Sequence, residues 1–235
     1  MRAIIIDDER LARKELATLL EKHKQIEVVG EAANVDEALT QIDEHNPGLI
    51  FLDIQMPGKT GFDLLEELDR VPQVIFTTAY DEFALNAFDV NALDYLLKPI
   101  QPERLDEALK KVDFTADIQP SKERLSKDSR VFVKDGDKCW FVKLETVRYF
   151  ESDGNYIKVY FDTFRPMIHK SLNALDERLD ERHFFRASRK HIINLEWVEK
   201  IDTWFNGGLL VELRGGDKIE VSRRQAARFR ERMSL

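Results

Sequence analysis

The first 112 residues alternate between short apolar runs and amphipathic segments, and this alternation restricts the possible folds more than any other feature. Each of five apolar runs is followed by a segment whose apolar residues recur at helical spacing. The runs lie at residues 3–6, 26–29, 49–53, 73–78 and 92–97, and the helical segments at 10–22, 35–42, 62–68, 81–89 and 102–112. The pattern predicts an α/β fold, a doubly wound five-stranded parallel sheet with helices on both faces.

Polar residues follow the ends of four of the expected strands. In a doubly wound sheet, right-handed crossovers bring the carboxyl ends of all strands to one edge, where ligands bind. That edge receives Asp7 and Asp8, Asp53, Thr78 and Lys98. Crowded carboxylates repel one another unless a cation lies between them, and Mg²⁺ prefers oxygen ligands. Because a carboxylate can accept a phosphoryl group whose oxygens a lysine and a hydroxyl can hold, the sequence predicts a phosphoryl-transfer site.

Residues 1–112 resemble the receiver domain of two-component response regulators. The resemblance is carried by Asp7-Asp8, by Asp53 with Met56-Pro57-Gly58, by Thr78-Ala79 and by Lys98-Pro99. It implies that Asp53 is the phosphoacceptor for a partner sensor histidine kinase, and that the Lys98–Pro99 peptide is cis. The other implied roles are Mg²⁺ binding by Asp8, Asp53 and the backbone carbonyl of Gln55, orientation of metal-bound water by Asp7, contact with phosphoryl oxygens by Thr78 and Lys98, and a conformational switch at Thr78 and Tyr95.

Two alternatives concern this half of the chain. Phosphatases of the haloacid dehalogenase type also use an aspartate at a strand end, but they need a second aspartate two residues later, where this chain has Gln55. No Walker-type phosphate loop occurs. For Tyr95, a tyrosine that only packs in the core is the alternative to a switch residue. We therefore expect the receiver to catalyse only its own phosphoryl transfer and dephosphorylation, and we do not expect the chain to be an enzyme.

The charge of the chain changes sign between its halves. Residues 1–112 contain 12 lysines and arginines against 23 aspartates and glutamates, residues 113–235 contain 24 against 21, and the overall net charge is −8. An acidic first half would repel nucleic acid, so any contact with DNA belongs to the second half. Residues 113–128 are polar, contain a proline and lack a sustained apolar period, which predicts a linker.

The second half, residues 129–235, consists mainly of short β-rich runs. These lie at 130–134, 139–142, 147–151, 156–161, 192–194, 198–201, 209–213 and 218–221, with helices expected at 171–180 and 223–233. Turn signals such as Asp153-Gly154-Asn155 separate neighbouring runs. The segment Gly215-Gly216-Asp217 is similar to part of a diguanylate cyclase signature, but it is followed by Lys218-Ile219 in place of an acid and an aromatic residue, and strands flank it. A hairpin turn at Arg214-Gly215-Gly216-Asp217 is the better interpretation. A mostly-β domain is predicted.

This half resembles the LytTR DNA-binding domain over residues 129–235. The segments that carry the resemblance are Tyr149 to Tyr156, Phe184 to Lys190 with Ile192 to Asn194, and Val221 to Arg224. The resemblance implies a mostly-β domain that reads the major groove of double-stranded promoter DNA with loop residues. It places the base and phosphate contacts on Asn155, Lys170, Arg189, Lys190, Arg223 and Arg224. The family usually has a histidine where this chain has Ser188, which leaves the base preference at that position open.

Together these patterns predict a DNA-binding transcriptional response regulator whose phosphorylation on Asp53 promotes formation of a homodimer and promoter binding. The surface expected to pair involves residues 81–89, 92–97 and 102–112. A signalling adaptor whose β domain binds protein is the alternative, and salt-dependent DNA binding separates the two. The chain has a single cysteine, Cys139, no apolar run that approaches the length of a membrane span, and no secretory signal at its start, so we expect a cytoplasmic protein that makes no contact with membranes.

Overall fold

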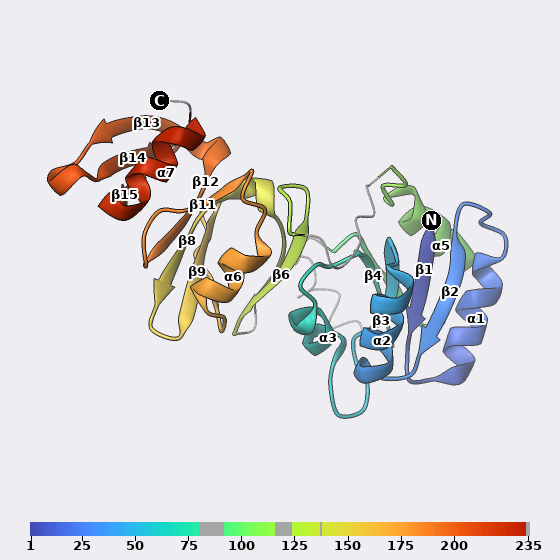
Figure 1. The fold of residues 1–235 in the computed structure, drawn as a ribbon. Coiled ribbons are helices and arrows are strands. Elements are labelled where there is room, and N and C mark those ends of the chain that lie inside the picture. Colours follow the sequence, from blue (N-terminus) through green and yellow to red (C-terminus); the bar gives the residue numbers. More distant parts are fainter. Residues whose placement is uncertain (80–91, 116–123, 137, 234–235) are drawn as a thin grey trace. The chain divides into compact units, whose positions relative to one another are not determined.

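The computed structural model describes residues 1–79, 92–115, 124–136 and 138–233, which form two compact units (Figure 1). The first unit contains residues 1–123, 130–132 and 136–141, and the second contains residues 124–129, 133–135 and 142–235. The helix expected at residues 81–89 lies outside the described residues. No helix of the described segments is long and apolar enough to cross a membrane.

A parallel sheet forms the centre of the first unit. Its strands are β1 (Arg2–Ile6), β2 (Glu27–Ala32), β3 (Leu49–Asp53), β4 (Gln73–Thr78) and β5 (Asp94–Leu97), in the spatial order β2-β1-β3-β4-β5. All four neighbouring pairs are parallel. Every residue of β3 is buried, as expected for the central strand of a sheet that is covered on both faces. The doubly wound fold predicted from the alternating pattern is confirmed.

Helices cover both faces of this sheet. Within the described residues they are α1 (Arg10–Leu20), α2 (Val35–His45), α3 (Gly61–Glu67) and α5 (Pro102–Lys110). On one face, Leu64 of α3 shares a core cluster with Ile50 of β3, and α2 packs on the same face. On the other, Leu16 of α1 shares a cluster with Phe51 of β3, together with residues of α5. Neighbouring residues of β3 thus point to opposite layers, because side chains alternate along a strand.

The start of α3 is fixed against the strand that carries Asp53. The side chain of Thr60 accepts a hydrogen bond from the Asp63 backbone N–H, and the Asp63 carboxylate accepts one from the Thr60 N–H, which makes a capping box. A Cβ atom on Gly61 would lie only 2.3 Å from the carbonyl oxygen of Asp53. Glycine is therefore required for α3 to approach the strand end at this distance.

Antiparallel strands dominate the second unit. One sheet contains β8 (Val147–Asp153), β9 (Tyr156–Phe161), β10 (Met167–Ile168), β11 (Phe184–Arg186) and β12 (His191–Asn194), in the order β10-β9-β8-β12-β11. A second sheet contains β13 (Val198–Thr203), β14 (Leu209–Leu213) and β15 (Lys218–Val221). The helical segments are α6 (Leu172–Arg178), α7 (Arg223–Met233), η2 (Leu144–Thr146), η3 (Leu195–Trp197) and η4 (Phe205–Gly207). The predicted mostly-β architecture is confirmed, although β10 and β11 were not expected as strands.

One core cluster of the second unit joins its two sheets to α7. Phe185 of β11, Val211 of β14 and Phe229 of α7 belong to one buried cluster. A further two-stranded sheet pairs β6 (Arg130–Asp135) with β7 (Lys138–Lys143). Gly215 and Gly216 connect β14 to β15 with φ angles of 99° and 88°, which confirms the hairpin turn predicted for this segment.

Asn194, the last residue of β12, is a buried polar residue whose side-chain nitrogen and oxygen are both hydrogen-bonded. Its side chain is completely buried, and its Nδ2 donates to the carbonyl oxygens of Val147 at 2.9 Å and Leu144 at 3.4 Å. Its Oδ1 accepts from the Glu196 backbone N–H at 3.0 Å. Because a buried amide is costly unless bonded, Asn194 serves the fold by joining β12 to the start of β8.

Candidate functional sites

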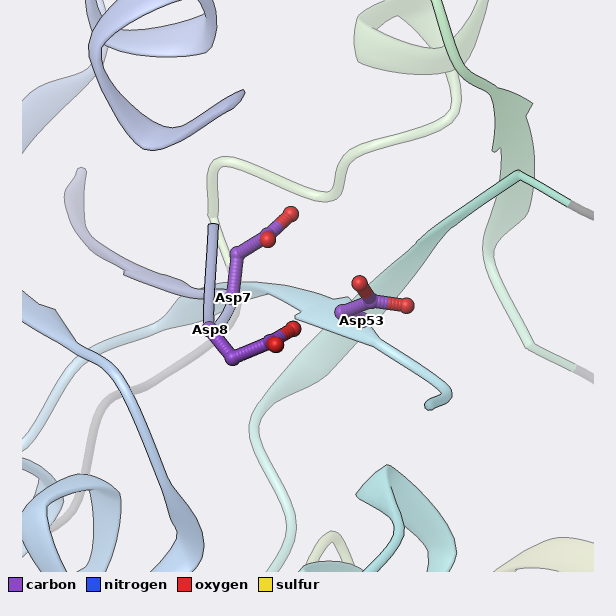
Figure 2. A group of neighbouring side chains, drawn as sticks. All are labelled: Asp7, Asp8 and Asp53. Carbon is purple, nitrogen blue, oxygen red and sulfur yellow. The ribbon is translucent and has the colours of Figure 1, made fainter. Parts of the chain in front are cut away.

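Three carboxylates meet at the carboxyl edge of the parallel sheet (Figure 2). Asp7 and Asp8 follow β1, and Asp53 ends β3. One oxygen from each of the three lies within 4.8 Å of the others, which is close enough to share a cation. Asp7 and Asp53 are buried, whereas Asp8 is exposed. The structure thus brings together three residues that the sequence pattern placed at this edge.

Lys98 connects the two buried carboxylates. Its Nζ lies 2.6 Å from Oδ2 of Asp7 and 2.6 Å from Oδ2 of Asp53. Lys98 follows β5, and its peptide bond to Pro99 is cis, as predicted. Burial disfavours the charged ammonium, but the bonds to both carboxylates outweigh it and raise the pKa of Lys98 above its ordinary value. Lys98 therefore remains a cation at neutral pH and is available to an anionic group.

Asp53 is held by hydrogen bonds to both of its oxygens. Oδ2 accepts from Lys98, and Oδ1 accepts from the backbone N–H of Gln55 at 3.1 Å. Burial raises the pKa of the Asp53 carboxyl, although the bond to Lys98 opposes this shift. A buried carboxylate that is held in one orientation by hydrogen bonds is well suited to attack an electrophile.

The side chains that the structure places in this pocket carry an excess of negative charge. Among the described residues, the three carboxylates lie against one ammonium, that of Lys98, so at formal charges two negative charges are left over from these four groups. The donor atoms are carboxylate oxygens, which are hard ligands that Mg²⁺ prefers. A divalent cation of this kind would neutralise the excess charge, so the residues fit a metal site.

Thr78 lies on β4, the neighbour of β3, and Tyr95 lies on β5, the edge strand beyond β4. Thr78 ends β4, is completely buried, and accepts the backbone N–H of Lys98 at its carbonyl oxygen, at 2.7 Å. Tyr95 of β5 is partly buried and packs against the core on the α2 and α3 face. The structure thus places Thr78 beside the lysine of the pocket and packs Tyr95 against the edge of the core.

Arg13 was not anticipated from the sequence, and it supports the two aspartates after β1. Its Nη1 donates to the carbonyl oxygens of Asp7 at 2.7 Å and Asp8 at 3.4 Å, and its Nε bonds to Glu31 at 3.0 Å. The available signal was its position in the first turn of the helix that follows Asp8. Every residue has a backbone carbonyl, so a sequence contains no particular residue type that would reveal the acceptor of such a bond.

Three loops of the second unit surround a hollow of about 650 Å³. Its lining includes Asn155 from the β8–β9 turn, Lys170 from the segment before α6, and Arg189 from the β11–β12 turn. All three side chains are exposed. These residues come from segments far apart in the sequence, and together they offer an amide and two cations to one partner.

Lys190 is exposed, but it is not equivalent to Lys170. Its Nζ lies 2.8 Å from Oε1 of Glu151, and the Tyr160 hydroxyl donates to the other carboxylate oxygen at 2.5 Å. Burial opposes ionisation of Glu151, but the bonds from Lys190 and Tyr160 outweigh it and lower the pKa of this carboxyl. The charge of Lys190 is therefore already partly compensated within the protein.

Arg223 and Arg224 open α7 and are both exposed. The preceding residue, Ser222, donates its backbone N–H to the carbonyl oxygen of Ala187 at 2.9 Å. Ala187 begins the turn that carries Arg189. This backbone hydrogen bond joins the residue before α7 to the start of the β11–β12 turn, so the two arginine-bearing segments lie side by side.

Comparisons with known proteins give matches in both halves of the chain. The response regulator receiver domain family matches residues 3–110, and the LytTr DNA-binding domain family matches residues 137–234. The chain is 33% identical over 241 residues to the sensory transduction protein LytT of Enterococcus faecalis and 31% identical over 240 residues to that of Bacillus subtilis, in each case over 100% of both chains. A crystal structure of the response regulatory domain of protein mrkE from Klebsiella pneumoniae is 37% identical, covering 47% of this chain and 93% of that chain with a TM-score of 0.43.

Proposed function

The chain belongs to the response regulators that join a receiver domain to a LytTR DNA-binding domain, and we propose that phosphorylation of Asp53 by a partner histidine kinase controls its binding to promoter DNA. Members of this family are generally transcription factors rather than enzymes. The proposal rests on the observation that one chain contains both an acidic pocket around Asp53 and a second unit whose loops carry cationic side chains. The proposed domains are a receiver at 1–112, a linker at 113–128 and a DNA-binding domain at 129–235, in a cytoplasmic protein.

The residues of the pocket account for a phosphoryl transfer. A carboxylate oxygen of Asp53 attacks phosphorus, the new P–O bond forms, and the bond from phosphorus to the kinase histidine nitrogen breaks, so that this nitrogen keeps the electron pair. The Lys98 ammonium, 2.6 Å from Asp53, and the Thr78 hydroxyl then hold oxygens of the transferred group. Asp8, Asp53 and the Gln55 carbonyl would bind Mg²⁺, with Asp7 orienting its water. Bound there, the metal would supply positive charge to the phosphoryl oxygens.

Asp8→Asn should weaken Mg²⁺ binding to the full chain by about tenfold or more, because it removes one of three clustered carboxylates. Asp8 is exposed, so this substitution should leave the folded core intact. Isothermal titration with MgCl₂ measures the change. Asp106→Asn, which alters an exposed aspartate on α5, is the matched control and should bind Mg²⁺ like the wild type. Equal affinities for all three proteins would show that Asp8 is not a ligand.

Phosphorylation is proposed to act through pairing of two chains. A homodimer would place two DNA-binding domains on adjacent half-sites, which raises affinity through effective concentration without any new base contact. In the receiver, Thr78 and Tyr95 are the proposed switch residues that pass the change from the pocket to the pairing surface. That surface is proposed to include β5 and α5 together with residues 81–89, which lie outside the described residues.

Lys170→Ala should lower the salt dependence of DNA binding more than Lys190→Ala does. Losing one phosphate-contacting lysine lowers the slope of log K against log salt by about one unit. Lys170 should show this full change, whereas Lys190 should show less because Glu151 already pairs with its ammonium. Titrations of each variant at several salt concentrations give the slopes. Equal decreases would mean that Lys190 leaves Glu151 entirely when DNA binds.

Selection of bound duplexes from a random pool tests the DNA-binding function directly. The wild-type chain should enrich one sequence family, and its affinity for the selected duplex should fall steeply with salt, because lysines and arginines displace counterions from phosphates. Retention of random duplexes without enrichment would point to sequence-blind binding. If no duplex is retained at low salt, the β domain is better explained as the protein-binding part of a signalling adaptor.

A further inference from the structure

Arg186 differs from the neighbouring arginines because its guanidinium is turned into the protein. It is the last residue of β11 and is partly buried. Its Nε donates to the Ser188 carbonyl oxygen at 2.7 Å, and its Nη2 donates to the Arg189 carbonyl oxygen at 3.0 Å. Both acceptors lie in the β11–β12 turn, so Arg186 is hydrogen-bonded to the backbone of the turn that carries Arg189.

The other side of the same guanidinium reaches the start of α6. Nη1 donates to the Leu172 carbonyl oxygen at 2.8 Å, and Nη2 donates to Oδ1 of Asn173 at 3.1 Å. Leu172 is buried and anchors this end of α6 in the core. Lys170 lies two residues before Leu172, so one guanidinium connects the segment that carries Lys170 to the turn that carries Arg189.

These bonds decide what Arg186 can do. A guanidinium has five N–H donors, and the bonds to the described residues use four of them. Forked recognition of a guanine needs two donors from the same side chain. Arg186 therefore lines the hollow beside Arg189 without being available to read a base.

We propose that Arg186 is a positioning residue that sets the sequence specificity of DNA binding by holding the Arg189 turn at a fixed distance from the Lys170 segment. This inference rests on the proposed DNA-binding function. It assigns specificity to a residue that contacts no base, because a flexible turn would let Arg189 adopt geometries that fit several bases. Lysine cannot replace it, since a compact ammonium on a flexible stem cannot span acceptors on two segments.

Arg186→Lys in the full chain is the primary test, because it keeps the positive charge and removes the planar guanidinium whose donors reach both segments. The ratio of affinities for the selected and a scrambled duplex should fall about tenfold, the size of losing one well-oriented base contact. Affinity for the scrambled duplex and its salt slope should stay at wild-type values. Arg182→Lys is the matched control, since that arginine bonds to Asp180 and should change neither quantity when replaced. Asn173→Ala removes one exposed acceptor and gives a milder variant with a smaller loss in the same direction.

A double variant separates positioning from a general loss of stability. If Arg186 acts through Arg189, then Arg186→Lys combined with Arg189→Ala should show the same affinity ratio as Arg189→Ala alone. Two results would overturn the inference while leaving DNA binding in place. One is a double variant whose affinity ratio falls by the product of the two single losses. The other is a wild-type affinity ratio in both Arg186→Lys and Asn173→Ala. A wild-type chain with no preference for any duplex would instead remove the proposed function, and this inference with it.

Discussion

An Asp53→Asn chain should take up no phosphoryl group from acetyl phosphate and Mg²⁺, under conditions in which the wild-type chain takes up one. The amide of asparagine has no anionic oxygen to attack phosphorus. The other two acids of the pocket, Asp7 and Asp8, follow β1 and not β3, and in the proposed mechanism they bind Mg²⁺ or orient its water and do not attack phosphorus. Intact-protein mass spectrometry measures the added group, and its release by hydroxylamine identifies an acyl phosphate.

Loss of uptake in this variant should not come from unfolding. Lys98 keeps its 2.6 Å bond to Asp7, and the repulsion between the Asp7 and Asp53 carboxylates disappears. In metal-free buffer the variant should therefore unfold at a temperature no lower than that of the wild type. Asp106→Asn, on the exposed side of α5, should be phosphorylated normally. Uptake by Asp53→Asn at the wild-type rate would show that another residue is the phosphoacceptor.

Arg189→Ala and Arg224→Ala should each lower affinity for the selected duplex by roughly 1–3 kcal/mol and relax the preference at one base position. The physical reason is that a planar guanidinium can donate to two acceptors of guanine at once, whereas an ammonium acts as a point charge. Both arginines are exposed, and a backbone hydrogen bond from Ser222 to Ala187 joins the segments that carry them. Titration against selected and scrambled duplexes gives the discrimination.

Lysine variants provide the control for this division of roles. Arg189→Lys and Arg224→Lys keep the charge but lose the fork, so binding to scrambled DNA should stay near the wild-type value while discrimination falls. Lys170→Ala should weaken binding to both duplexes by the same factor. If Arg189→Ala and Lys170→Ala have the same effect on both duplexes, arginine and lysine do not divide specificity and attraction in this way.

The architecture of the first unit was predictable because its signals are local and repeated. Apolar runs such as Leu49 to Leu52 identify buried strands, and right-handed crossovers then determine where their ends meet. The positions of Asp7, Asp8, Asp53 and Lys98 follow from that topology. The extent of β2 does not: the sequence indicated residues 26–29, but the strand runs over Glu27–Ala32 because pairing with β1 carries it past Gly30.

The short strands of the second unit could not be predicted, because their signals are neither local nor repeated. β10 has two residues and β11 has three, which is too few for an alternating pattern to appear. They are strands because β9 and β12 offer them backbone partners. Tertiary pairing, and not local preference, creates such elements.

Contacts between segments that are distant in the sequence explain the other features of the second unit that the sequence did not predict. Lys190 meets Glu151 because β12 pairs with β8 in a register that sets His191 opposite Glu151, a register that the composition of the two strands does not reveal. Arg186 bonds mostly to backbone carbonyls, which every residue possesses, so no partner residue type indicates its role. Asn155, Lys170 and Arg189 were all named from the sequence, but the shared hollow between them emerged only from the fold.

The central claim is that a phosphoryl group on Asp53 changes DNA binding by the other half of the chain. The most direct measurement titrates phosphorylated and unphosphorylated protein onto duplexes that carry one or two copies of the selected half-site. Phosphorylation should raise affinity for the two-site duplex by about tenfold or more, through pairing, and should leave the single-site duplex and the Asp53→Asn chain unaffected. Equal affinity of the two forms for the two-site duplex would contradict the claim, because the receiver would then not control the DNA-binding domain.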